Sequence, residues 1–114
     1  MAHHQNLGGA AYVFLEKVST MTEVLDALSE IPGVEAVYSR KEGSRHFGLM
    51  ADRIGDCVVL ADKDVVFGKF TSCEVEVSVR SHGSMHERFV PIIGYPRLPE
   101  GCKMNLDITA LMEL

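Results

Sequence analysis

The chain has 114 residues, of which 46% are hydrophobic and 24% are charged, and its formal net charge is -5. This length suits one domain with its own core, and the hydrophobic content is that of a folded protein, which excludes a disordered chain. An acidic balance without a basic run argues against a nucleic-acid partner, and no apolar stretch approaches the roughly 20 residues of a membrane span.

Three cysteines, Cys57, Cys73 and Cys102, are odd in number and widely spaced. Because no CxxC pair occurs, the sequence indicates neither a disulfide framework nor a thiolate zinc site. No signal-peptide pattern opens the chain. We therefore expect reduced thiols in a cytoplasmic protein.

The first half of the chain predicts a strand, a helix and a second strand. Residues 10–15 (AAYVFL) follow two glycines and have the composition of a buried strand. Thr20 and Glu23 have the spacing of a capping box, and Pro32 is expected to stop the helix that follows. Residues 34–39 (VEAVYS) are the next expected strand. The predicted apolar stripe of the helix is Met21, Val24, Leu25, Leu28 and Ile31.

A strand, helix and strand in this order favour a parallel or split βαβ unit with a ferredoxin-like opening, the helix lying on one face of the sheet. Residues 40–52 then mix charge with glycine, and we expect a loop or a short helical turn there, held to the core by Phe47, Leu49 and Met50. Within this segment, His46 is interpreted as a surface histidine rather than a ligand.

Residues 57–61 (CVVLA) and 65–67 (VVF) predict a hairpin. Of the acidic residues Asp56, Asp62 and Asp64, two lie in or beside turns that favour aspartate for backbone reasons, so we interpret all three as structural rather than catalytic.

Residues 73–79 alternate apolar and polar side chains at the period of a half-buried strand. This strand would deliver residues 80–87 (RSHGSMHE) into an exposed turn, where Gly83 allows a tight bend beside His82. A histidine mounted in this way suits a metal ligand, although an ordinary exposed polar loop has the same pattern.

The rest of the chain predicts a short strand at residues 92–93, a loop over residues 95–101 and a capped helix over residues 105–114. Residues 1–114 are thus expected to form a single α+β domain. It would contain a mixed sheet of about five or six strands, one main packed helix and a short C-terminal helix. The apolar side of the last helix is expected to hold Ile108, Leu111 and Met112.

The segment around His82 resembles a known family. Residues 80–83 (RSHG), the later Glu87 and residues 90–94 (VPIIG) resemble the last metal-ligand motif of phosphonoacetate hydrolase, in the alkaline phosphatase superfamily. Residues 53–68 are similar to the hairpin upstream of that histidine in the family. Residues 4–15 are similar to the stretch after the family's core Asp-His motif.

This resemblance implies a hydrolase with two zinc ions and a threonine nucleophile that cleaves a phosphonate C–P bond, or, as close relatives do, a phosphate ester. It implies one metal ligand in this chain, His82, and no catalytic or cofactor-binding residue. The Asp-His motif, the other metal ligands and the nucleophilic threonine have no counterpart here, so we expect a C-terminal fragment that is inactive alone. Ser84 and His86 depart from the residue types common at their positions in the family.

Two alternatives remain open from the residues. One is a self-contained ferredoxin-like module that binds a small molecule or pairs as a symmetric homodimer. The other is a local metal site of His82, His86 and Glu87, which requires that segment to be helical. His3 and His4 have two interpretations, as the remnant of a histidine tag or as native residues.

Overall fold

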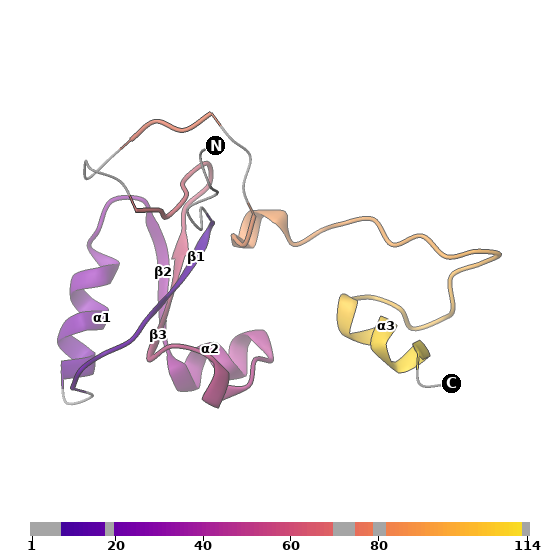
Figure 1. Ribbon diagram of the computed structural model, residues 1–114, viewed down its shortest axis with the longest axis horizontal. Coiled ribbons are helices and arrows are strands. Elements are labelled where there is room, and N and C mark those ends of the chain that lie inside the picture. The colour runs from indigo at the N-terminus through magenta and orange to yellow at the C-terminus, as the bar shows by residue number, and fades with distance from the viewer. Residues whose placement is uncertain (1–7, 18–19, 70–74, 79–81, 113–114) are drawn as a thin grey trace.

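The computed structural model describes residues 8–17, 20–69, 75–78 and 82–112. Figure 1 shows the strands and the first helices of the chain lying together, with a long C-terminal arm leading away from them. The elements, in chain order, are β1 (Ala10–Val13), α1 (Met21–Ser29), β2 (Val34–Ser39), α2 (Arg40–Phe47), η2 (Ala51–Arg53), β3 (Cys57–Ala61), η3 (Met85–Glu87) and α3 (Asn105–Met112), where η marks a 3₁₀ helix.

The sheet of the described residues has the strand order β1-β3-β2, and β3 is antiparallel to both neighbours. The α+β class is confirmed, but the expected mixed ferredoxin-like sheet of five or six strands is wrong. The strands β1 and β2 run in the same direction and are separated by β3, so they never pair. The sequence of β3 explains its central place, because all five residues of CVVLA are buried and a strand covered on both faces needs such a continuous apolar run.

The expected hairpin is also wrong. After β3 the chain turns through Asp64, whose φ is +61°, and does not return along β3. Instead Phe67 forms a single antiparallel bridge with Gly8, through hydrogen bonds of 2.8 and 3.3 Å. The described parts of two other expected strands, residues 75–78 and 92–93, have no strand pairing. Residues 73–74 and 79 lie outside the described residues.

Helix α1 covers one face of the sheet, where the thiol of Cys57 lies 3.4 Å from the sulfur of Met21. The predicted stripe is half-buried within the helix, whereas Ile31 lies beyond its end and is 47% exposed. The expected capping box is not formed, because the hydroxyl of Thr20 donates to the carbonyl of Lys17 instead. The helix ends at Ser29, ahead of the predicted stop at Pro32.

Helix α2 occupies most of the segment where we expected a loop or a short helical turn. Ser39 caps it, since its hydroxyl accepts from the amide of Glu42 while the Glu42 carboxylate accepts from the Ser39 amide. Gly48 ends the helix in the left-handed conformation, with φ of +66°. Gly43 is buried against the sheet, where an added Cβ would lie 2.9 Å from a methyl group of Val58, so glycine permits the close approach of this helix.

The second face of the sheet carries the apolar core. Ile54, Val58 and Leu60 are buried there, and Tyr38, Phe47 and Met85 are among the half-buried residues packed on them. Of the three expected anchors, Phe47 contacts this core, whereas Leu49 is 38% and Met50 58% exposed. Met85 belongs to η3, so this short helix closes one side of the core and marks the start of the arm.

The arm beyond η3 has no regular structure until α3. Phe89 and Tyr95 are each 98% exposed, and Ile93 is 91% exposed. The predicted C-terminal helix is confirmed as α3, which Asp107 caps by accepting from the amides of Lys103 and Met104. Ile108 of its expected apolar side is 39% exposed, and the side chains of Leu111 and Met112 lie outside the described residues. No helix in the described parts of the chain is long and apolar enough to cross a membrane.

Candidate metal site

His82 lies in the turn between the undescribed residues 79–81 and η3, and its side chain is exposed as predicted. Gly83 has φ of +95°, which confirms the tight bend that we expected at this glycine. The carbonyl of His82 accepts a hydrogen bond of 2.7 Å from the amide of Gly9. The turn is therefore fastened by its backbone to the segment that leads into β1.

A close approach between Gly9 and Ser84 completes this attachment. Gly9 is buried, and a Cβ added to it would lie 2.6 Å from both the Cβ and the amide nitrogen of Ser84. Such a distance is shorter than carbon contacts allow, so this place needs glycine. Gly9 thereby lets the turn that carries His82 lie directly against the start of β1.

Ser84 caps η3 in the same manner as Ser39 caps α2. Its hydroxyl accepts from the amide of His86, while the carboxylate of Glu87 accepts from both the amide and the hydroxyl of Ser84. The hydrogen bond from the Ser84 hydroxyl is the main cause that lowers the pKa of Glu87. Glu87 is therefore already engaged in a local structural role.

The alternative site of His82, His86 and Glu87 is wrong. It required a helix that brings His82 and His86 to one face, but helical structure here extends only over Met85–Glu87. Among the described residues, the group with metal-ligand spacing joins His86 to two residues of the sheet region and contains neither His82 nor Glu87.

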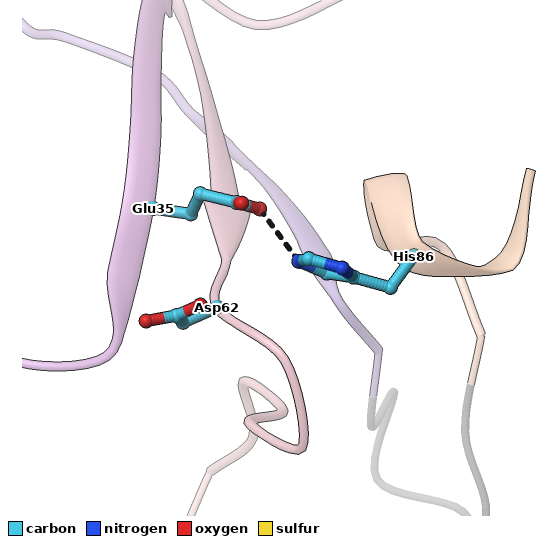
Figure 2. A group of neighbouring side chains, drawn as sticks. All are labelled: Glu35, Asp62 and His86. Carbon is cyan, nitrogen blue, oxygen red and sulfur yellow. Dashed lines mark hydrogen bonds and ion pairs between the residues drawn. The ribbon is translucent and has the colours of Figure 1, made fainter.

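This group consists of Glu35, Asp62 and His86. One ligand atom from each lies within 4.8 Å of the others, and all three side chains are exposed. The Nε2 atom of His86 lies 3.0 Å from a carboxylate oxygen of Glu35. Figure 2 shows these two side chains facing each other, with Asp62 beside them at the end of β3.

Each of the three residues is held in place by a different element. Glu35 lies between Val34 and Ala36, where the register of β2 against β3 shifts, so it is the extra residue of a β-bulge and its side chain is re-aimed. Asp62 directly follows β3, and its amide donates to the carbonyl of Gly33 at 2.8 Å. The third, His86, belongs to η3. The fold thus brings together β2, the turn after β3 and the start of the arm.

The sequence indicates this group only in part. Asp62 has the turn position of a structural aspartate, the sequence spacing of His86 places it with His82 and Glu87, and no sequence pattern marks Glu35. Asp56 does have the structural role we expected, since its carboxylate accepts from the amide of Leu15 and from Arg40, at 2.8 and 2.9 Å. Asp64 lies in the turn after β3, in the left-handed conformation.

The remaining histidines do not join this group in the described structure. His46 is exposed and stacks on Tyr38, with ring centroids 5.2 Å apart, as suits a surface histidine beside the anchoring Phe47. His3 and His4 lie outside the described residues.

Comparison with known proteins gives a structural relationship. No family model matches the chain. Two crystal structures of phosphonoacetate hydrolase from Sinorhizobium meliloti 1021 match it at 31% sequence identity. The structure in complex with phosphonoacetate has a TM-score of 0.62 over 70% of this chain, and the structure in complex with phosphonoformate has 0.61 over 69%. The chain matches a portion of phosphonoacetate hydrolase.

The resemblance inferred from the sequence is thereby confirmed. Each match covers 20% of the solved phosphonoacetate hydrolase chain, so this chain spans about a fifth of the length of these relatives. That the portion is C-terminal, and that His82 is a metal ligand, remain predictions.

The described residues near His82 do not provide a complete zinc site of the kind that the resemblance to phosphonoacetate hydrolase implies. A catalytic zinc ion needs about three protein ligands. Among the described residues, His82 belongs to no group of three donors with metal-ligand spacing. We therefore assign no chemical step to a zinc ion on this chain alone.

Proposed function

We propose that the chain is the C-terminal part of a zinc-dependent, phosphonoacetate hydrolase-like enzyme. The enzyme would hydrolyse a phosphonate C–P bond or a phosphate ester, and this chain would contribute His82 as one metal ligand while being inactive alone. The observation that carries the proposal is the match to phosphonoacetate hydrolase, at 31% identity over 70% of this chain. The relative was crystallised with phosphonoacetate and with phosphonoformate, which supports a small phosphonate as the substrate class.

The attachment of the His82 turn to Gly9 supports the same proposal. By resemblance, residues 4–15 follow the Asp-His motif of the family, and the hydrogen bond between Gly9 and His82 joins this segment to the turn. Metal ligands from distant parts of a chain must be brought together by such backbone contacts. An Asp-His motif directly before residue 4 would be close to Gly9 in the sequence, and Gly9 is hydrogen-bonded to the turn that carries His82. The fold would thereby bring the motif and the proposed histidine ligand toward each other.

The exposed arm weighs against the alternative of a small-molecule module that is complete as a monomer. A complete module closes its apolar surface, whereas Phe89, Ile93 and Tyr95 are almost fully exposed.

The test is the activity of the complete gene product with zinc, measured as phosphate released from phosphonoacetate and as alcohol released from a phosphate monoester. We expect hydrolysis by the complete product and none by the 114-residue chain. Because second-shell changes already cost 10–100-fold, His82→Ala should lower kcat/KM by at least about 100-fold and reduce bound zinc.

His46→Ala is the matched control, since His46 is an exposed histidine of the same chain, and it should leave the rate unchanged. An active His82→Ala enzyme with full zinc content would contradict the role of His82. A reading frame that begins close to Met1 would contradict the proposal that the chain is a fragment.

A further inference from the structure

We propose that Glu35, Asp62 and His86 bind one divalent transition-metal ion, of the zinc class, which fastens η3 to the sheet. This site is separate from the catalytic zinc site to which His82 would contribute. The proposal rests on the geometry of the three side chains and does not require that the chain belong to a hydrolase.

The distances suit a metal ion after a small movement. Zinc lies about 2.0–2.2 Å from nitrogen and carboxylate ligands, so two ligands of a tetrahedral site are roughly 3.3 Å apart. Glu35 and His86 are already at 3.0 Å, and all three ligand atoms lie within 4.8 Å. Asp62 is exposed, and its Oδ1 accepts a 2.8 Å hydrogen bond from the amide of Lys63, so the Asp62 side chain would have to rotate away from that amide, or bind the ion through its second oxygen, to complete the site.

Electrostatics favour a cation between these side chains. Two carboxylates lie close together, and among the described residues neither forms an ion pair with Lys or Arg; Glu35 faces the imidazole of His86, and Asp62 accepts from the amide of Lys63. A divalent ion would neutralise both carboxylates at once. The net charge of the chain, -5, adds to the attraction.

The donor set selects among the cations. One imidazole nitrogen with two carboxylates suits zinc and related transition metals, whereas magnesium and calcium prefer oxygen ligands throughout. Three protein ligands leave one tetrahedral position for water, which the exposure of the group makes accessible.

The location gives the ion a structural task. Glu35 and Asp62 belong to the sheet region, while His86 is the single member of the group on the arm, and it is 51 residues from Glu35 in the sequence. Bridging them would hold η3 against the sheet, and with it the turn that carries His82. The ion would therefore order the start of the arm.

The experiment is zinc titration by calorimetry on the 114-residue chain, in a background with His3→Ala and His4→Ala so that the N-terminal histidines do not contribute. We expect one zinc ion per chain and a higher Tm with zinc present. Glu35→Gln, Asp62→Asn and His86→Gln should each weaken binding by at least about tenfold and abolish the rise in Tm.

The matched controls are Glu30→Gln and His46→Gln, which change exposed residues of the same types outside the group and should leave binding unchanged. A folded parent chain that binds no zinc would overturn the proposal, as would unchanged binding in the three variants. Binding that is lost in His82→Ala but kept in His86→Gln would also overturn it. A negative result in this titration would not bear on the proposed role of His82 as a metal ligand in the complete enzyme, so the two proposals can fail independently.

Discussion

The amide of Gly9 donates a 2.7 Å hydrogen bond to the carbonyl of His82 and so joins the start of β1 to the turn before η3. The contact depends on the missing side chain of Gly9, because a Cβ there would lie 2.6 Å from the backbone nitrogen of Ser84. The conformation of the turn that carries His82, the predicted metal ligand, therefore depends on Gly9, which is 73 residues earlier in the sequence.

Gly9→Ala should therefore destabilise the chain and displace the His82 turn. Forcing a methyl group into a packed backbone contact costs about 1–3 kcal/mol. Chemical denaturation would measure this loss, and the NMR signals of residues 82–84 should shift. Gly8→Ala is the matched control, since its Cβ would meet its nearest atom, the carbonyl oxygen of His82, at an ordinary 3.4 Å. Equal losses in the two variants would contradict the proposed contact.

A second prediction concerns Asp56, which links α2, β3 and the end of the first strand. Its carboxylate accepts from the amide of Leu15 and from Arg40. Asp56→Ala would leave that amide and the guanidinium without these partners, so we expect a loss of about 1–3 kcal/mol in the free energy of unfolding.

A double-mutant cycle with Arg40→Ala would divide this loss between the two partners. The side chain of Arg40 is 41% exposed, so its coupling to Asp56 should stay below about 1 kcal/mol, with most of the loss arising at Leu15. Asp52→Ala, at an exposed aspartate, should change stability by less than about 0.5 kcal/mol. A coupling energy as large as the whole loss would contradict this division.

The elements that the sequence predicted well are those whose signal is local. Short apolar, β-rich runs located β1, β2 and β3, and apolar periodicity with capping signals located α1 and α3, because each of these patterns lies within a single element. The alternation in residues 73–79 did not produce a strand in the described residues 75–78. The hairpin failed because Phe67 pairs with Gly8, a choice that depends on tertiary structure and not on the turn residues. Helix α2 was predicted only as a loop or a short helical turn because of its polar composition, although Ser39, Glu42 and Gly48 provide its start and stop signals.

The candidate metal site could be predicted less well than the fold. The resemblance in residues 80–83 predicts His82 as a metal ligand, and the bend at Gly83 was correctly predicted. The group of Glu35, Asp62 and His86 has no spacing signal, because its members come from three segments that meet only in the folded sheet. The aim of Glu35 depends on a β-bulge, which the sequence VEAVYS does not indicate.

A third prediction concerns the acidic stability of α2. The pKa of Glu42 lies below its usual 4.5, mainly because its carboxylate accepts from the amide of Ser39 and secondly from the Ser39 hydroxyl. Since the folded pKa is lower than the unfolded one, the contribution of Glu42 is complete above about pH 4.5 and is lost as the pH falls through the folded value. The far-ultraviolet helix signal should therefore weaken in acid below that pH.

The residue-level test is an NMR titration of the glutamates. Ser39→Ala removes the hydroxyl and keeps the amide, so the pKa of Glu42 should rise only part of the way toward 4.5, and loss of the N-cap should cost the helix about 1 kcal/mol. Glu87, which has the equivalent pair with Ser84, should keep its lowered pKa and serves as the internal control. A Glu42 that titrates at 4.5 or above in the parent chain would show that the capping box is not formed in solution.

The last prediction is the low reactivity of Cys57. Its side chain is fully buried between β3 and α1, and burial, together with the nearby Asp56 carboxylate, raises the pKa of its thiol. The thiolate is the reactive form, so Cys57 should react with a disulfide reagent far more slowly than the half-buried Cys102.

A Cys73→Ser background removes the third thiol, which lies outside the described residues. We expect one rapid equivalent and one that reacts only with denaturant, and Cys57→Ala should remove the slow one. Two rapid equivalents would place the Cys57 thiol in contact with solvent and contradict the packing of α1 on the sheet.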